Sequence, residues 1–415
     1  MPEQLQPVRG THDFLPDEMR RYRRVAEAAR LAAECFGYQE MATPIFEFSE
    51  VFKRTLGDTS DIVTKEMYTF TSRGNESLTL RPEGTAGVAR AFMSGGLAQN
   101  LPLKFFYSGP MFRYESPQAG RMRQFHQTGI ELLGIKEPLG DVEVIATGAE
   151  FLRRIGVWHR AQLEINTLGD TESRNNYRTV LVEYLTGHRD KLSAESVERL
   201  GRNPLRILDS KQERDQAIVA NAPIYTDYLN ETSKDFFERV KDGLTTLGID
   251  FVVNPRLVRG LDYYCHTCFE VTCDELGAQK TILAGGRYDG LIGIMGGPET
   301  PGVGWASGIE RCAMLLQEEP AARRPIAMVP LGERAEKVAL KLAGDLRRVD
   351  FAVDLGFSGS MKSRMKRANK INASAAVILG DNELDQGQAT VRNLGSGEQT
   401  AVALDKLADA LEAYR

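Results

Sequence analysis

Small residues occupy every second position of the segment GVGWASG, and this alternation is the strongest constraint that the sequence places on the fold. Gly302, Gly304, Ala306 and Gly308 fall on one side of an extended strand, while valine, tryptophan and serine fall on the other. The first side is therefore a floor with almost no side chains, which suits a flat purine ring. The glycines match neither phosphate-binding pattern, G-x-x-x-x-G-K-[ST] or strand-G-x-G-x-x-G, so a nucleotide on this floor would bind in another way.

A predicted antiparallel hairpin spans residues 100–135, with FFYSGPMFRYE and RQFHQTGIELLG flanking a loop at Ser116–Arg121. On the second strand, alternation places Gln127 and Glu131 on one face, separated by Gly129. This arrangement forms a shelf for a small polar ligand, because the carboxylate can take an ammonium group and the amide can donate or accept a hydrogen bond. The alternative is a solvent-exposed strand face.

Arginines gather around the loop of this hairpin. Arg113 lies just before the loop, and its planar guanidinium suits a phosphate or a carboxylate. As a lone residue it would be an ordinary surface arginine. The loop SPQAGRMR carries Gln118, Arg121 and Arg123 without an acidic residue. That composition suits contact with a phosphate backbone.

Two predicted helix starts carry residues that suit a ligand. In RPEGTAGVARAF, Glu83 and Thr85 lie at the entry to a helix, where Thr85 could cap the helix or bind a ligand. In PGVGWASGIERCAMLL, Ser307 and Glu310 predict a capping box at the start of the second helix. Arg311 in the first turn of that helix opposes the helix dipole, which is weak evidence that it meets a terminal phosphate.

The segment RGLDYYCHTCFEV predicts part of a strand over Leu257–Val271. On a strand, Tyr263 and Tyr264 point to opposite faces, so that one can line a pocket while the other packs in the core. Cys265 and Cys268 form a C-x-x-C pair, but a tetrahedral zinc site needs four protein ligands and the sequence has no second pair. We therefore expect no metal site.

A length of 415 residues predicts two or three domains. A mostly helical pattern from about 171 to 247 predicts an inserted helical subdomain. EEPAARRP, at residues 318–325, is a plausible linker, and beyond it strands and helices alternate as in a small α/β domain.

A net charge of −5 limits any RNA contact to local basic patches. One such patch is the predicted helix 360–371, where Lys362, Lys366 and Lys370 share a face. That face is either simply solvated or in contact with RNA. No apolar run reaches the roughly 20 residues that a membrane span needs. The five cysteines are scattered and odd in number, which favours a reducing cytoplasm over a disulfide framework.

Together the motifs VRGTHDFLP, RPEGT, GPMFRYE-x-PQ-x-GR-x-RQFHQ, VRGLDYY, GGRYDGL and GVGWASGIER resemble the histidyl-tRNA synthetase family over nearly the whole chain. RGLDYY is specific to the histidine enzymes and their close relatives. The resemblance implies an α+β class II core over residues 1–320, with an antiparallel sheet flanked by helices, a helical insertion, and an α/β anticodon-binding domain over residues 325–415. It also implies a cytoplasmic homodimer.

The same resemblance implies a reaction and its site. Histidine would be activated with ATP, accompanied by Mg²⁺, to histidyl-adenylate and then transferred to the 3′ end of its tRNA. The residues implied in catalysis are Arg259 and Arg113. Those implied in binding the ATP are Arg113, Arg311 and Gly304. Those implied in holding histidine are Glu83, Thr85, Gln127, Glu131 and Tyr264. The loop implied to approach the tRNA acceptor end contains Ser116, Gln118, Arg121 and Arg123.

The alternative function is that of a histidine-sensing regulatory paralogue of the biosynthetic ATP phosphoribosyltransferase. Such paralogues typically lack the arginine of RGLDYY and the C-terminal domain. This sequence retains Arg259 and a basic C-terminal domain, so we favour the enzyme.

Two departures from the family pattern stand out. The hairpin loop of the family usually reads E-R-P-Q, and Ser116 replaces its arginine here. After RGLDYY the family usually has Asn-Arg-Thr, and here Cys265 and His266 precede Thr267. The first departure bears on how the tRNA acceptor end is recognised.

We predict that this protein charges tRNA without depending on the extra 5′ guanosine that histidine tRNAs usually carry. Serine at position 116 removes a full positive charge and up to five hydrogen-bond donors, and a lost base contact is worth about 1–3 kcal/mol of discrimination. The measurement is the charging of paired transcripts with and without the guanosine. A preference of about a hundredfold for the guanosine-bearing transcript would show instead that a neighbouring arginine takes over.

Overall fold

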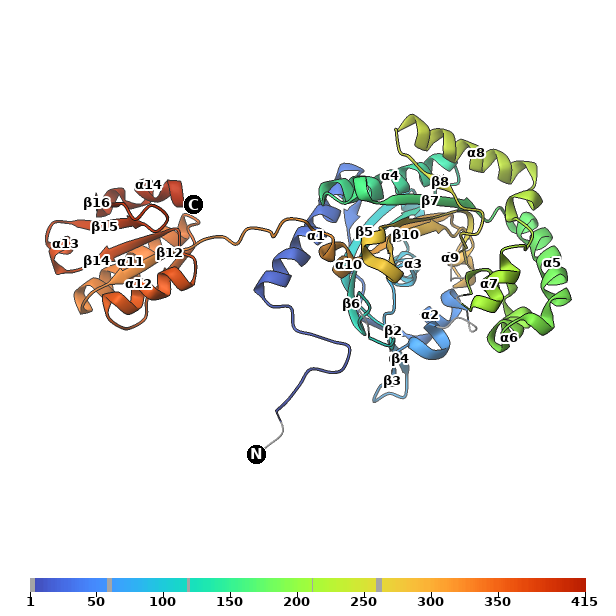
Figure 1. Ribbon diagram of the computed structural model, residues 1–415, viewed down its shortest axis with the longest axis horizontal. Helices are drawn as coiled ribbons and strands as arrows, with labels where there is room; N and C mark the ends of the chain where they lie inside the picture. Colours follow the sequence, from blue (N-terminus) through green and yellow to red (C-terminus); the bar gives the residue numbers. More distant parts are fainter. Residues whose placement is uncertain (1–3, 58–61, 118–119, 211, 259–262) are drawn as a thin grey trace. The chain divides into compact units, whose positions relative to one another are not determined.

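The computed structural model describes residues 4–57, 62–117, 120–210, 212–258 and 263–415. The chain divides into two compact units, Met1–Pro320 and Ala321–Arg415 (Figure 1). Within the described ranges, none of the helices combines the length and the apolar content that crossing a membrane requires.

An eight-stranded sheet is the frame of the first unit (Figure 1). Its strands, in spatial order, are β1 (Gln39–Glu40), β5 (Leu103–Phe112), β6 (Gln124–Leu133), β11 (Gly302–Gly308), β10 (Thr281–Arg287), β9 (Cys265–Thr272), β7 (Gln162–Thr167) and β8 (Val252–Val253). The six central strands pair antiparallel, and the predicted hairpin is β5 and β6. This confirms the predicted fold class. The two edge strands pair parallel with β5 and β7, because a long segment that contains helices connects the two strands of each pair.

Helices cover this sheet and extend beyond it. Those of the first unit are α1 (Pro16–Cys35), α2 (Ser49–Leu56), α3 (Thr85–Ser94), α4 (Pro138–Arg154), α5 (Thr171–Gly187), α6 (Ala194–Arg202), α7 (Glu213–Val219), α8 (Glu231–Thr246), α9 (Leu291–Ile294) and α10 (Ile309–Met314). A small antiparallel sheet contains β2 (Phe46–Phe48), β4 (Ser77–Leu80) and β3 (Thr69–Thr71).

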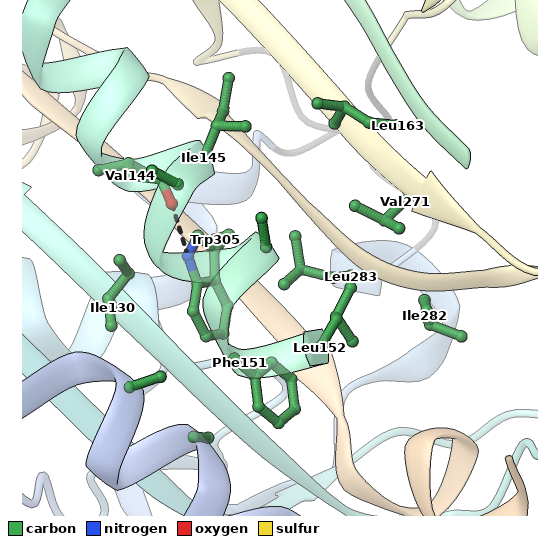
Figure 2. Close-up of a cluster of buried hydrophobic side chains, with 14 of the residues drawn as sticks. Ile130, Val144, Ile145, Phe151, Leu152, Leu163, Val271, Ile282, Leu283 and Trp305 are labelled. Carbon is green, nitrogen blue, oxygen red and sulfur yellow. Dashed lines mark hydrogen bonds between the residues drawn. The ribbon is translucent and has the colours of Figure 1, made fainter. Parts of the chain in front are cut away.

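The main core lies between α4 and one face of the large sheet, and Figure 2 shows its centre. Trp305 of β11 stacks on Phe151 of α4, with ring centroids 5.8 Å apart and planes 8° apart. Its Nε1 donates a hydrogen bond of 3.0 Å to the Val144 carbonyl. The alternation in GVGWASG therefore places its large residues against α4 and its small residues on the opposite face of the sheet.

The predicted helical insertion is divided between two cores. Phe237, Val240 and Leu244 of α8 are buried in the main core, where α8 packs along α4. Tyr177 and Leu181 of α5 belong instead to a second core, which includes residues of α2, α3 and α6–α7 and their connections. The helical pattern was predicted correctly, but its last helix is part of the frame that supports the sheet.

The second unit is a five-stranded mixed sheet with helices on both faces. Its strands, in spatial order, are β13 (Val353–Leu355), β12 (Ile326–Pro330), β14 (Ala375–Leu379), β15 (Gln388–Asn393) and β16 (Gln399–Ala403). Its helices are α11 (Glu333–Arg348), α12 (Met361–Lys370), α13 (Asp381–Asp385) and α14 (Leu407–Leu411). Residues of α11 and α14 pack in one core, whereas Ala368 and Met365 of α12 pack on the other face of the sheet.

A fully buried ion pair fastens the end of β10 to the start of α4. The Arg287 guanidinium and the Asp141 carboxylate are both 0% exposed, and Nε of Arg287 lies 3.0 Å from Oδ2 of Asp141. Arg287 also donates to the Ile135 carbonyl at 2.8 Å and to Asp289 at 3.0 Å. These acceptors offset the free-energy cost of burying the guanidinium charge, so the removal of one of them leaves part of that cost uncompensated.

We predict that Asp141→Ala lowers the free energy of unfolding by about 3–5 kcal/mol, since it leaves the Arg287 charge buried without its main partner. Chemical denaturation of the full chain measures this loss. The matched control is Glu238→Ala, which removes an exposed pair with Lys241 and should cost less than about 1 kcal/mol. Equal effects of the two substitutions would contradict the role given to the buried pair.

Candidate active site

A cavity of ≈ 270 Å³ opens on the face of the large sheet opposite α4. Its lining comes from β6, β10 and β11, from the start of α3, from the tyrosines that precede β9, and from the loop between β5 and β6. The cavity thus collects residues that are widely separated in the sequence.

The small residues of β11 lie beneath this cavity, as the alternation predicted. Gly304, Ala306 and Gly308 line it, together with Ala284 on the neighbouring strand β10. A side chain at Gly304 would overlap the Glu131 carboxylate and the Ile130 carbonyl. Glycine is therefore required at this position for the polar groups above it to keep their places.

One end of the cavity is a buried cluster around Glu131. Its carboxylate accepts hydrogen bonds from the Thr85 hydroxyl, at 2.7 Å, and from the Tyr288 hydroxyl. Burial raises the pKa of Glu131 to about 8, against the lowering effect of these hydroxyl groups. Gln127 also lines the cavity, and its Oε1 is buried without a hydrogen-bond partner in the described part of the chain. The shelf predicted on β6 therefore exists, and it faces a cavity.

Glu83, rather than Thr85, caps the start of α3. The Glu83 carboxylate accepts hydrogen bonds from the backbone N–H groups of Thr85, at 2.6 Å, and Ala86, at 2.8 Å. Burial raises the pKa of Glu83, and these N–H donors oppose that rise. The Thr85 hydroxyl is thereby left to bond Glu131, and both residues line the cavity. Of the two alternatives open for Thr85, capping the helix and binding a ligand, the structure does not support capping.

Tyr263 and Tyr264 both line the cavity, with ring centroids 4.7 Å apart. The prediction that they point to opposite faces of a strand was wrong, because β9 begins only at Cys265. Its pairing also shifts: Arg287 pairs with Cys265, whereas Gly286 pairs with Cys268. Strand alternation does not apply to the two tyrosines, so both can face the ligand space.

Three arginines surround the other end of the cavity: Arg113, Arg121 and Arg311 all line it. Burial lowers the pKa of Arg311, and the charges of the other two arginines add to this effect. Glu115 is the nearby counter-charge, 2.9 Å from Nε of Arg121 and 3.7 Å from Nη1 of Arg113. Arg311 donates to the carbonyls of Gly120 and Thr281. Because positive charge exceeds negative charge here, this end suits a polyanion.

Glu310 lies beside these arginines and does not form the predicted capping box with Ser307. The Glu310 carboxylate accepts a hydrogen bond from the backbone N–H of His126 at 2.9 Å and contacts Nδ1 of its ring at 2.8 Å. The Ser307 hydroxyl donates to the Ile282 carbonyl at 2.7 Å. That prediction was wrong because both side chains bond neighbouring strands instead of the helix start.

The remaining predicted residues do not line the cavity or lie outside the described residues. Ser116 is exposed. Arg123 lies over the Tyr114 ring, 3.9 Å from its centroid, and is not among the residues that line the cavity. Gln118 and Arg259 lie outside the described residues.

Sequence reasoning missed Tyr288, Tyr107 and Glu115. Tyr288 is the tyrosine of GGRYDGL and bonds Glu131. Tyr107 of β5 is buried below the same cluster, and its hydroxyl has no hydrogen-bond partner among the described residues. Glu115 lies two residues after Arg113, and this spacing is the one sequence feature that could have indicated Glu115 as a site residue. The tyrosines gave no comparable signal, because their positions depend on long-range packing.

Comparisons with known proteins agree over the whole chain. A family model described as histidyl-tRNA synthetase matches residues 10–312, and one described as an anticodon binding domain matches residues 326–414. The histidine–tRNA ligase of Rhodospirillum rubrum is 61% identical over 411 residues, 99% of each chain. That of Gluconacetobacter diazotrophicus is 54% identical over 401 residues, 97% of each chain. The solved apo histidyl-tRNA synthetase of S. aureus is 34% identical, with a TM-score of 0.83 over 98% of this chain and 99% of that one.

We predict that Gly304→Ala lowers the free energy of unfolding by about 1–3 kcal/mol, because the added methyl group displaces Glu131 in a packed site. It should also raise the histidine concentration needed for activation at least tenfold. Gly308→Ala is the matched control for stability, since a Cβ there meets nothing closer than 3.9 Å. Thermal unfolding and histidine titration measure both effects. A Gly304→Ala protein with unchanged melting temperature and histidine affinity would contradict the steric argument.

Proposed function

The chain belongs to the histidyl-tRNA synthetase family, and we propose that its cavity is the place where histidine is joined to ATP. Its activity is that of a histidine–tRNA ligase: histidine is activated with ATP to histidyl-adenylate and transferred to the 3′ end of its tRNA. The observation that best supports this location of the reaction is the unequal distribution of charged and hydrogen-bonding groups along the cavity. Buried acceptors lie at one end and a cluster of arginines at the other.

Histidine fits the end around Glu131. Glu131, Gln127 and Glu83 offer acceptors for the ammonium group and for an imidazole N–H, and the hydroxyls of Thr85 and Tyr264 offer further hydrogen bonds. The unpartnered Gln127 oxygen supports this assignment, because a buried acceptor without a partner is costly unless a ligand satisfies it. Pairing every polar atom of the substrate also rejects analogues that lack one of them.

ATP fits the other end. Its adenine would lie on the floor of β11 over Ala306 and Gly308, because the Glu131 carboxylate fills the space above Gly304, while Arg113 and Arg311 would hold the phosphates. Mg²⁺ is usually held by one or two carboxylates together with phosphate oxygens. Glu115 and Glu310 line this end and meet that requirement, and a bound ion would neutralise part of the phosphate charge.

The chemical step is an in-line attack of the histidine carboxylate on the α-phosphate, which displaces pyrophosphate. Two anions must approach each other, so the main task of the protein is to position them and to neutralise charge. Arg113 belongs to the arginine cluster and is held by a hydrogen bond of 2.9 Å from its Nε to the Pro82 carbonyl. We assign Arg259 to the same task on the family resemblance.

The loop between β5 and β6 is our candidate for contact with the tRNA acceptor end. It joins the arginine-rich end of the cavity to the surface, where Ser116 is exposed. Arg121 already has an ionic partner in Glu115, and Arg123 lies on the Tyr114 ring. We therefore expect these arginines to orient the tRNA backbone, with little discrimination among bases.

We also propose that the protein acts as a homodimer. Phe46, Phe48 and Phe70 on the small sheet are exposed by 53%, 55% and 44% of their surface, and Ile45 beside them by 44%. An apolar patch of this kind on a folded domain usually marks an interface. A second copy of the chain is the partner that the family resemblance supports.

A regulatory histidine sensor, the alternative considered above, needs only the end around Glu131. The arginine cluster argues for the enzyme, because Glu115 balances only part of its positive charge and a bound polyanion would balance the rest. Arg113, Arg121 and Arg311 have no evident purpose in a protein that binds histidine alone.

We predict that Arg259→Ala and Arg113→Ala each reduce histidine-dependent pyrophosphate exchange into ATP at least a hundredfold. Their effect on histidine binding should be smaller, since a charge at the reacting groups stabilises mainly the transition state. Arg123→Ala is the control, because Arg123 lies beside the same loop but does not line the cavity. It should keep normal exchange. Near-normal exchange in either of the first two variants would remove that arginine from the mechanism.

A further inference from the structure

The N-terminal segment 8–15, which carries the motif VRGTHDFL, has no place in the site as described so far. Figure 1 shows it as a stretch without helix or strand that leads into α1. It begins with a turn, in which the Thr11 N–H donates to the Val8 carbonyl at 2.9 Å. Most of its side chains are exposed, while Phe14 is partly buried. Packing in a hydrophobic core therefore does not explain the path of this segment.

Gly10 joins the N-terminal segment to the β5–β6 hairpin. Its carbonyl accepts a hydrogen bond of 2.7 Å from the Arg123 N–H. This bond uses the Arg123 backbone, so it persists when the Arg123 side chain is removed. A Cβ at Gly10 would lie 2.7 Å from Cγ of Arg123 and 3.0 Å from Cγ of Pro117, and the φ of Gly10 is +86°. Both the close approach and the backbone conformation therefore require glycine here.

Phe14 joins the same segment to His126 of β6. The two ring centroids are 5.3 Å apart, with planes at 79°. Tyr22 of α1 makes a second T-shaped contact with the imidazole, at 4.9 Å and 78°, and lies 5.8 Å from the Phe14 ring. Aromatic rings that meet edge to face prefer that mutual orientation. The imidazole of His126 is therefore held by one ring from the N-terminal segment and one from α1.

His126 in turn holds both oxygens of the Glu310 carboxylate. Its backbone N–H donates to Oε1 at 2.9 Å and to Oε2 at 3.0 Å, and its Nδ1 lies 2.8 Å from Oε1. Glu310 lines the arginine-rich end of the cavity. Within the described part of the chain, its carboxylate pairs with His126 and with none of the clustered arginines. The contact with His126 therefore leaves more of the positive charge of the cluster to a phosphate.

We propose that His126 is a positioning residue of the ATP site and that the N-terminal segment acts through it. Phe14 fixes the imidazole, the imidazole fixes the Glu310 carboxylate, and Gly10 fixes the segment on the hairpin. The proposal rests on the proposed function, because it concerns the end of the cavity assigned to ATP. A displaced carboxylate at this end would pair with an arginine or repel the phosphates. ATP binding should therefore depend on these contacts, whereas histidine binding around Glu131 should not.

The first test removes the contact with Glu310 and keeps a ring at position 126. In the full chain, His126→Phe should raise the ATP concentration for half-maximal pyrophosphate exchange by about tenfold or more, and leave that for histidine nearly unchanged. Equilibrium dialysis of ATP with Mg²⁺, without histidine, should show a similar loss of affinity. His159→Phe is the matched control, since His159 is exposed and is not among the residues that line the cavity. An unchanged ATP affinity, or equal losses for ATP and histidine, would overturn the proposal.

The second test asks whether Phe14 acts through His126. Phe14→Ala should weaken ATP binding several-fold, and Phe14→Tyr, which keeps the ring, should bind ATP normally. Phe14→Ala combined with His126→Phe should be no worse than His126→Phe alone, because the imidazole that Phe14 orients is already absent. Leu5→Ala is the control, since Leu5 precedes the same segment and is 96% exposed. Losses that add in free energy would show that Phe14 acts independently of His126, and would overturn the proposal.

The third test follows the contact between the segment and the hairpin without measuring activity. Gly10→Ala should speed amide hydrogen exchange in the peptide that contains Arg123, because the Arg123 N–H loses its acceptor. It should also weaken ATP binding as Phe14→Ala does. Gly37→Ala is the matched control: Gly37 has a similar φ of +80°, but a Cβ there meets no atom within 4 Å. Unchanged amide exchange in Gly10→Ala, or an equal change in the control, would overturn the role of this contact.

The unaltered protein separates failure of this proposal from failure of the proposed function. If it shows no histidine-dependent pyrophosphate exchange, the proposed function fails and this proposal fails with it. If it exchanges normally while His126→Phe and Phe14→Ala bind ATP normally, only this proposal fails. Thermal unfolding distinguishes positioning from a purely structural role. A large fall in the melting temperature of these variants, with ATP and histidine affected equally, would overturn the positioning role.

Discussion

The two faces of β11 perform opposite tasks, and the cavity depends on both. Trp305 on one face is held by its stacking on Phe151 and its hydrogen bond to Val144, which fixes the strand against α4. On the other face, the absence of a side chain at Gly304 leaves room for the Glu131 carboxylate. A strand with large residues on both faces would be anchored equally well but would fill the ligand space. The strict alternation of large and small residues is thus the condition for having a core and a cavity separated by one strand.

The electrostatics of the cavity follow from this geometry. Burial raises the pKa of Glu131 to about 8, so this carboxyl holds its proton more strongly than an exposed one. At the other end, burial and mutual repulsion lower the pKa of Arg311. Both shifts mean that each end is stabilised in its charged form by a partner of opposite sign. A substrate with a cationic group and a polyanionic substrate, bound together, supply both partners at once.

The sequence allowed the sheet, the hairpin and the shelf on β6 to be predicted, because strand alternation assigns Gln127 and Glu131 to one face. It did not allow the hydrogen-bond partners to be predicted. Glu83 accepts the N–H groups at the start of α3 while Thr85 bonds Glu131, and Glu310 bonds His126 of β6 instead of capping a helix. Each of these outcomes depends on a residue distant in sequence, which local patterns cannot identify. The arginine cluster was predicted only in part, since Arg121 was assigned to the tRNA loop alone.

His266 lies at an irregularity in β9 that closely follows the two tyrosines. Its φ is +42°, in the left-handed region that side chains other than glycine adopt at a cost of about 1 kcal/mol or more. Backbone hydrogen bonds hold it there: its N–H donates to the Gly169 carbonyl, and its carbonyl accepts from the Leu168 N–H, each at 2.7 Å. Its ring stacks on Phe236 of α8, with centroids 4.4 Å apart. These contacts offset the strain and bend the chain directly after Tyr264. The histidine at this position, a departure from the family pattern, therefore ties the pocket tyrosines to α8, the helix that packs along the main core.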